Sequence, residues 1–193
     1  MTPIILATRN QHKLVELRRL LGEGRVLALP AEVELGPELG ETFAENALTK
    51  ARAAAAATAR AAIADDSGIC AVALGGAPGV LSARFAGDGA SDEQNLALLR
   101  ERVPAGSELA YVCAIAYVDP GGGVERVFEG RCEGRMAPAP LGSGGFGYDP
   151  VFIPDGGDGR TMAQLDAAHK DELSHRGAAL RALAAWLAEQ PPR

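Results

Sequence analysis

Two adjacent carboxylates, a hydroxyl and a glycine follow one another in the segment Asp65-Asp66-Ser67-Gly68. The apolar run 61–64 before them has the composition of a strand, and ligands of open α/β sheets bind at the carboxyl ends of strands. Neighbouring side chains of an extended chain point to opposite faces, so the two acids need not do the same job. One can hold a hard cation such as Mg²⁺, the other can activate a water, and Gly68 lets the chain turn. The alternative is a strand that ends in an ordinary Asx turn.

A second group of polar residues lies near the N-terminus. Residues 3–7 predict a short buried strand, and Asn10 is a suitable N-cap for a helix over 12–21, where leucines recur at helical spacing. Lys13 lies one turn into that helix. Because helix N-termini attract anions, Lys13 indicates a phosphate contact. A solvated surface lysine is the alternative.

The glycine-rich segment 138–150 ends in Gly144-Gly145-Phe146-Gly147-Tyr148-Asp149-Pro150. Two aromatic side chains between glycines, beside an acid, suit stacking on a flat ligand and hydrogen bonding to its edge. The same residues could instead anchor a turn.

The start of the last predicted helix carries two cationic side chains. Ser174 is its expected cap, and His175 and Arg176 occupy its first turn, where cations oppose the helix dipole. This placement indicates a ligand contact, although a surface turn could tolerate it. Lys170 lies just past a short helix that begins with a capping box at Thr161 and Gln164. The last helix is expected to pack through Leu180, Leu183, Ala184 and Leu187.

An acidic loop over 30–41, which contains Glu38, precedes the clearest helix start. Thr42 and Glu45 form a capping box, and an alanine-rich helix is predicted over 44–60. Asn46 and Lys50 fall one turn apart on one face of this helix and could look into a site. Acidic loops and polar helix faces are, however, commonly just solvated.

The remaining segments complete an α/β pattern. A capping box at Ser91 and Gln94 starts a helix to about Arg102. Residues 109–118 are apolar on both faces, as in a central strand, and 124–136 alternate, as in a half-exposed antiparallel strand that completes a hairpin. We therefore expect a central mixed, twisted sheet with flanking helices and two lobes around an active cleft.

Composition narrows the classes of function. The 193 residues suit a single domain over 1–193, and the net charge of −6 argues against nonspecific binding of duplex nucleic acid. The three cysteines form no C-x-x-C pair and indicate reduced thiols in the cytoplasm. With no apolar run of about 18 residues and no signal-peptide pattern, no association with a membrane is expected.

Taken in order, these segments resemble the inosine triphosphatase-like family, the non-canonical purine nucleoside triphosphate pyrophosphatases, over essentially the whole chain. Arg9 departs from the family pattern, in which this position of the first phosphate-binding loop is often Gly. The matching segments are Thr8-Arg9-Asn10-x-x-Lys13-x-x-Glu16, residues 38–46, Ala64-Asp65-Asp66-Ser67-Gly68, Gly75-Gly76-Ala77-Pro78-Gly79, residues 144–150 and Ser174-His175-Arg176.

The resemblance implies hydrolysis of ITP, dITP and XTP to the monophosphate and pyrophosphate, which clears deaminated purines from the nucleotide pool. It implies dependence on Mg²⁺ and a homodimer. Glu38 and Asp66 would ligate the metal with Asp65 nearby, and Asp66 would accept the proton of the attacking water. The implied substrate contacts are Thr8, Arg9, Asn10, Gln11, His12 and Lys13, chiefly to the phosphates, then Ser67, the base pocket of Phe146, Gly147, Tyr148 and Asp149, and finally Lys170, His175 and Arg176.

Two other functions stay open at this point. The chain could be a phosphatase that removes a terminal phosphate, or a pyrophosphatase that acts on another nucleotide. It could also be a non-catalytic nucleotide-binding module, although a pure binder has little need for Glu38, Asp65 and Asp66 beside a polyphosphate. The haloacid dehalogenase class is disfavoured because Thr8-Arg9-Asn10, after the first strand, contains no acid.

Overall fold

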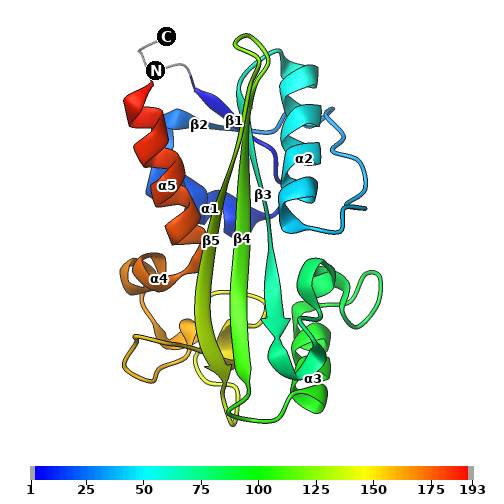
Figure 1. The fold of residues 1–193 in the computed structure, drawn as a ribbon, viewed down its shortest axis with the longest axis vertical. Coiled ribbons are helices and arrows are strands. Elements are labelled where there is room, and N and C mark those ends of the chain that lie inside the picture. The colour runs from blue at the N-terminus through cyan, green and yellow to red at the C-terminus, as the bar shows by residue number, and fades with distance from the viewer. Residues whose placement is uncertain (1–2, 191–193) are drawn as a thin grey trace. The chain divides into compact units, whose positions relative to one another are not determined.

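A mixed sheet organises the chain, with strand order β2-β1-β3-β4-β5-β6 (Figure 1). The computed structural model describes residues 3–190, apart from the side chain of Glu23. β1 pairs in parallel with both β2 and β3, whereas β5 and β6 pair antiparallel. The strands are β1 (Ile4–Leu6), β2 (Val26–Ala28), β3 (Ala62–Ala71), β4 (Glu108–Asp119), β5 (Val124–Met136) and β6 (Phe152–Pro154). The helices are α1 (Gln11–Leu21), α2 (Phe43–Thr58), α3 (Asp92–Arg102), α4 (Ala167–Leu173) and α5 (His175–Glu189).

The described chain divides into two compact units. Unit 1 comprises residues up to Asp66, Cys113–Gly130 and the chain from Ala178 onward; unit 2 comprises Ser67–Val112 and Arg131–Gly177. The chain therefore passes from one unit to the other within β3, β4, β5 and α5. The expected single domain and the cleft between its lobes stay predictions.

In unit 1, helices cover both faces of the strands. One face packs against α2, whose small side chains Ala47, Ala51 and Ala54 are fully buried. The opposite face packs against α1 through Leu17 and against α5 through Leu180 and Leu183 (Figure 1). β3 shows the alternation directly, because Ala62 and Ala64 face α2 and Ile63 faces α1 and α5.

The core of unit 2 is built from strand ends, α3 and the segment after β5. Tyr111, Phe152 and Met162 are buried together, and α3 contributes Leu99. The capping boxes predicted at Thr42, Ser91 and Thr161 are all present, although the last opens only a 3-10 turn, Met162–Gln164. In the described part of the chain, no helix has both the length and the apolar character needed to span a membrane.

The prediction of a turn at Gly68 is wrong. β3 continues without interruption to Ala71, so the two acids lie in the middle of a strand and not at its end. A Cβ at Gly68 would collide with Ser82 Oγ and would lie 2.5 Å from the carbonyl oxygen of Gly79. The glycine is thus explained by the close approach of the 3-10 segment Gly79–Arg84. One further expectation fails, because Ala184 is exposed and does not pack with the leucines of α5.

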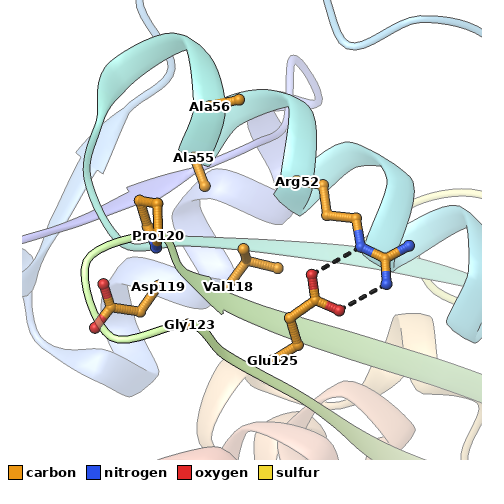
Figure 2. Close-up of a pocket in the computed structure, with 8 residues that line it drawn as sticks. All are labelled: Arg52, Ala55, Ala56, Val118, Asp119, Pro120, Gly123 and Glu125. Carbon is orange, nitrogen blue, oxygen red and sulfur yellow. Dashed lines mark hydrogen bonds and ion pairs between the residues drawn. The ribbon is translucent and has the colours of Figure 1, made fainter.

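A surface cavity of about 290 Å³ lies in unit 1 beside α2 and the turn between β4 and β5 (Figure 2). Arg52 donates two hydrogen bonds, of 2.9 and 2.6 Å, to the carboxylate of Glu125 at its edge. None of the residues that line this cavity belongs to the site predicted from the sequence. The cavity is therefore distinct from that site.

Candidate active site

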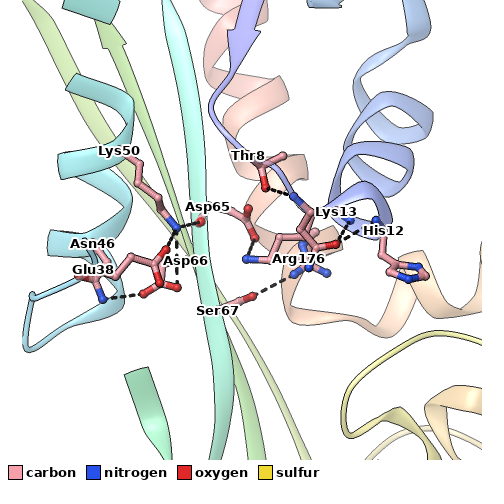
Figure 3. Close-up of polar contacts among 11 residues, drawn as sticks. Thr8, His12, Lys13, Glu38, Asn46, Lys50, Asp65, Asp66, Ser67 and Arg176 are labelled. Carbon is pink, nitrogen blue, oxygen red and sulfur yellow. Dashed lines mark hydrogen bonds and ion pairs between the residues drawn. The ribbon is translucent and has the colours of Figure 1, made fainter. Parts of the chain in front are cut away.

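The two adjacent acids point to opposite faces of β3, as strand alternation predicts. Asp65 shares the face of Ile63, and its carboxylate forms an ion pair of 2.9 Å with Lys13 of α1. Asp66 faces α2 and accepts a hydrogen bond of 2.9 Å from Asn46 Nδ2 (Figure 3). Both acids are buried, at 1% and 6% exposure.

Lys50 is the centre of the face that carries Asp66. Its ammonium donates to the carboxylate of Glu38 and, at 2.8 Å, to the main-chain carbonyl of Asp65, and it lies 4.0 Å from Asp66 Oδ1 (Figure 3). We call Glu38, Asn46, Lys50 and Asp66 the Lys50 cluster. The capping box at Thr42 fixes the start of α2, and the helical spacing of Asn46 and Lys50 then directs both side chains to one place.

Asn46 also holds the loop that carries Glu38. Its Oδ1 accepts a hydrogen bond of 2.8 Å from the main-chain N–H of Gly40, and a Cβ at Gly40 would lie 2.7 Å from that oxygen. A single amide therefore joins this loop to Asp66 on β3. This arrangement brings the carboxylates of Glu38 and Asp66 to the same side of the sheet.

Burial and charge alter the acidity of this cluster. Burial lowers the pKa of Lys50, but the carboxylates of Asp65, Glu38 and Asp66 raise it by more, so its pKa is above the usual value and the ammonium stays charged. Burial raises the pKa of Asp66, while Lys50 and Asn46 act in the opposite direction. A raised pKa makes the ionised Asp66 carboxylate a better proton acceptor than an ordinary aspartate.

The segment 8–13 forms a capped helix start. Asn10 Oδ1 accepts hydrogen bonds from the main-chain N–H groups of His12 and Lys13, at 2.9 and 3.3 Å, and Thr8 Oγ1 accepts one from Asn10 (Figure 3). Gln11 and His12 are exposed. This cap orients the first turn of α1, from which Lys13 reaches Asp65.

Arg9 holds the loop after β2, a role that the sequence did not indicate. Its guanidinium donates to four main-chain carbonyls, those of Leu29, Pro30, Ala31 and Val33, at 2.8–3.1 Å. A glycine at this position could make none of these hydrogen bonds. The side chain of Arg9 therefore fastens the loop after β2, and a substrate contact from this residue would have to come from its main chain.

In unit 2, two of the predicted substrate contacts, Phe146 and Lys170, form hydrogen bonds with Asp149. Its carboxylate accepts hydrogen bonds from Lys170 Nζ at 2.7 Å, the main-chain N–H of Phe146 at 2.9 Å and the hydroxyl of Tyr111 at 3.1 Å. We call Tyr111, Phe146, Asp149, Lys170 and His175 the Asp149 cluster. Tyr148 points elsewhere and donates to the carbonyl of Ser82, and the N–H of Gly147 donates to Asp92.

Three more of the predicted substrate contacts lie in unit 2, namely Ser67 of β3 and the first two residues of α5, His175 and Arg176. Arg176 is 3% exposed, and its Nη2 donates to Ser67 Oγ at 2.9 Å. The imidazole of His175 stacks on the ring of Tyr111. Ser174 caps α5 as predicted, because its hydroxyl accepts from the N–H of Gly177.

Comparison with known proteins identifies the family. The Ham1 family model matches residues 4–186. The chain belongs to the Ham1 family.

Similar known proteins cover nearly the whole chain. It is 50% identical to a "dITP/XTP pyrophosphatase" of Mycolicibacterium paratuberculosis over 95% of this chain and 94% of the relative, and 49% identical to one of Frankia alni, with 96% and 97% covered. A solved HAM1 protein from Coxiella burnetii superposes with a TM-score of 0.86 at 38% identity, covering 98% of this chain and 100% of the other. These matches confirm the sequence resemblance and the α/β fold.

Three residues of this Ham1 protein's clusters were not among the predicted site residues. Asn46 and Lys50 had a signal, since both lie on one face of a predicted helix, but solvated polar residues have the same spacing. Tyr111 had none, because it belongs to an apolar strand and meets Asp149 only in the folded chain.

The oxygens that face Lys50 suit a magnesium ion. Mg²⁺ prefers carboxylate and carbonyl oxygens, and the carboxylates of Glu38 and Asp66 already converge on a cation, the Lys50 ammonium. Within residues 3–190, no group of three or more His, Cys, Asp or Glu side chains is placed to hold a metal. The carboxylate of Asp65 does not join the pair, because it lies on the other face of β3 with Lys13. Glu38 and Asp66 are therefore the acids that could hold Mg²⁺ together.

Proposed function

We propose that this Ham1 protein hydrolyses dITP, ITP and XTP to the monophosphate and pyrophosphate and so clears deaminated purines from the nucleotide pool. The observation that carries the proposal is Asp66, a buried carboxylate with a raised pKa, beside Glu38 and a charged Lys50. Relatives of about half-identical sequence named dITP/XTP pyrophosphatase support the choice of substrate.

In the proposed reaction, water attacks the α-phosphorus, and the bond from that phosphorus to the bridging oxygen of pyrophosphate breaks. Asp66 accepts the proton of the water, for which its raised pKa suits it. Lys13, held in place by Asp65, stabilises the negative charge that grows on the departing pyrophosphate. Asn46 keeps the Asp66 carboxylate in one orientation.

Mg²⁺ is the proposed cofactor, with Glu38 and Asp66 as its ligands and Asp65 nearby. When bound, it supplies neutralisation of the triphosphate charge. Before Mg²⁺ and substrate bind, the Lys50 ammonium holds the carboxylate of Glu38 near that of Asp66. The main-chain and side-chain groups of residues 8–13 are the proposed phosphate contacts, with the Arg9 side chain reserved for the loop after β2.

Base selection is assigned to unit 2. Inosine and xanthine present a carbonyl oxygen where adenine has an amino group. Ser67, Phe146, Gly147, Tyr148 and Asp149 are proposed as substrate contacts together with Lys170, His175 and Arg176. The last three are donors, and an adenine amino group facing a buried donor would cost about 1–3 kcal/mol, or roughly ten- to a hundredfold in discrimination.

We further propose a homodimer and a cytoplasmic location. The dimer follows from the family resemblance, and light scattering coupled to size-exclusion chromatography tests it. The location agrees with the cysteines, because Cys70, Cys113 and Cys132 are all thiols that form no disulfide.

A product assay tests the function. dITP, XTP, ATP and GTP are incubated with the protein, with Mg²⁺ or with EDTA, and pyrophosphate and orthophosphate are measured separately. We expect pyrophosphate from dITP and XTP, only with Mg²⁺, and its loss in Asp66→Asn but not in the exposed control Asp88→Asn. Orthophosphate as the product, or equal turnover of ATP, would favour a phosphatase or a pyrophosphatase with another substrate.

A further inference from the structure

The carboxylate of Asp149 is almost fully occupied within the protein. It is 4% exposed, and Tyr111, Lys170 and the N–H of Phe146 donate to it. These three hydrogen bonds use most of the roughly four acceptor positions of a carboxylate. Asp149 is therefore better placed to hold other groups than to contact a ligand.

The groups that Asp149 holds lie together. Lys170 Nζ is 5.1 Å from the centre of the Phe146 ring, and the guanidinium of Arg176 is 5.6 Å from the same ring. One oxygen of Asp149, Oδ2, binds both the Lys170 ammonium and the main-chain N–H of Phe146. The position of this aromatic ring relative to its two cations thus depends on where the carboxylate sits.

Tyr111 holds the Asp149 carboxylate through the other carboxylate oxygen. Its hydroxyl donates to Oδ1 of Asp149 at 3.1 Å, the oxygen that Lys170 and Phe146 leave available. Burial raises the pKa of Tyr111 well above its usual range, and the charge of Asp149 raises it further, so the hydroxyl remains a proton donor at neutral pH.

The ring of the same tyrosine also supports His175. The two rings are nearly parallel, with centroids 4.6 Å apart and planes at 9°. The ring of Tyr111 also packs against that of Phe152, with the ring centroids 4.5 Å apart, and this contact places Tyr111 in the core of unit 2. Tyr111 therefore touches both the donor His175 and the carboxylate that places Lys170 and Phe146.

We propose that Tyr111 is a positioning residue for base recognition, acting through Asp149 on Lys170 and Phe146 and through ring stacking on His175. Asp149 is then a positioning residue as well, and its carboxylate does not contact the base. This inference rests on the proposed function and refines its base pocket. A tyrosine that merely fills the core would support stability without affecting which base is bound.

The test is a double-mutant cycle read by calorimetric binding of IMP and AMP. Tyr111→Phe keeps the ring and the stacking on His175 but removes the hydroxyl. We expect it to weaken IMP binding about tenfold, the worth of one hydrogen bond to a charged group, and to narrow the preference for IMP over AMP. In the background of Asp149→Asn, the same change should have less than about a twofold further effect, because coupled residues are not additive.

Tyr117→Phe is the matched control, since Tyr117 is a buried tyrosine of unit 1 that packs against Trp186. It should leave both binding constants unchanged. The inference is overturned if Tyr111→Phe lowers the melting temperature but leaves the affinity for IMP unchanged. It is also overturned if the loss of IMP affinity in Tyr111→Phe adds fully to the loss in Asp149→Asn, or if IMP fails to bind the wild type. Pyrophosphate release from dITP by the wild type is measured in parallel, so a failure of the proposed reaction is seen separately from a failure of this inference.

Discussion

At the scale of single residues, the proposed proton acceptor Asp66 has a cost to stability. Burial raises its pKa above the unfolded value by more than Lys50 and Asn46 lower it. An acid of this kind stabilises the fold most when protonated, below the unfolded pKa of about 3.9, and that contribution is lost as the pH rises through the folded pKa. At neutral pH the ionised carboxylate therefore lowers the free energy of unfolding.

Asp66→Asn is expected to raise the melting temperature in EDTA at pH 7 while it lowers the rate of hydrolysis by about 10²–10⁴-fold, the usual contribution of a general base. The gain in melting temperature over the wild type should shrink as the pH falls through the raised folded pKa of Asp66, and it should be gone below the unfolded pKa of about 3.9. Calorimetric scans from pH 3.5 to 8, with Asp88→Asn as the control, measure both effects. A variant less stable than the wild type at pH 7 would contradict this account.

Replacement of Lys50 is expected to have the opposite effect on stability from Asp66→Asn. Its ammonium is the cation shared by Glu38, Asp66 and the Asp65 carbonyl, so Lys50→Met leaves two carboxylates facing each other without it. Loss of one partner of a buried pair costs about 3–5 kcal/mol, and we expect about 2–3 kcal/mol here because Glu38 is partly exposed.

Urea unfolding in EDTA measures that loss, with Lys50→Arg as the charge-preserving control. If Glu38 and Asp66 bind Mg²⁺, added Mg²⁺ should stabilise Lys50→Met more than the wild type. Equal stability of Lys50→Met and the wild type in EDTA would show that Lys50 does not neutralise these acids.

At the scale of elements, β3 is held against the 3-10 segment Gly79–Arg84 by one hydroxyl. Ser82 Oγ accepts from the N–H of Ile69 at 2.9 Å and donates to the carbonyl of Gly79 at 2.6 Å. This contact leaves no space for a side chain at Gly68. The glycine thus serves packing between two elements and not a change of chain direction.

Gly68→Ala should therefore destabilise the protein by about 1–3 kcal/mol, the usual cost of overpacking. Gly121→Ala is the control, because its Cβ would meet only Asp119 Oδ1, at an ordinary 3.5 Å, and its φ is not in the left-handed region. Chemical denaturation of both variants tests the difference. If the two alanines cost the same, the close approach is not what requires a glycine at 68.

Regular elements could be predicted from the sequence because their signals are local. Helix α2 followed from a capping box and alanine content, and the opposite orientation of Asp65 and Asp66 followed from strand alternation. The failures concern contacts between distant segments. Ser82 meets Gly68 across the fold, and no local pattern marks that contact.

The same reason explains what the sequence left out of the site. The hydroxyl of Tyr111 meets Asp149, 38 residues away, inside an otherwise apolar strand. The guanidinium of Arg9 donates to main-chain carbonyls of the loop after β2, which is 20 or more residues away along the chain. In each case the partner is defined by tertiary structure, whereas residue type and spacing describe only the neighbourhood along the chain.

At the scale of the whole molecule, the two units are interleaved in the chain. Unit 1 is assembled from three segments and unit 2 from two, and each of β3, β4, β5 and α5 contributes to both. Expression of residues 1–66 or 67–112 alone is therefore expected to give unfolded polypeptide. Circular dichroism and hydrogen exchange of these fragments test this, and a fragment that melts cooperatively would refute it.

This interleaving also limits how such a protein can change over evolutionary time. No single crossover between two genes can exchange one unit intact, because unit 1 contributes both the first and the last segment and every breakpoint therefore divides it. A chimaera that takes unit 2 from another protein would need four coordinated junctions, three of them inside strands. Changes in the proposed base preference are therefore expected to accumulate as point substitutions within one lineage, and the two units are inherited as a single block.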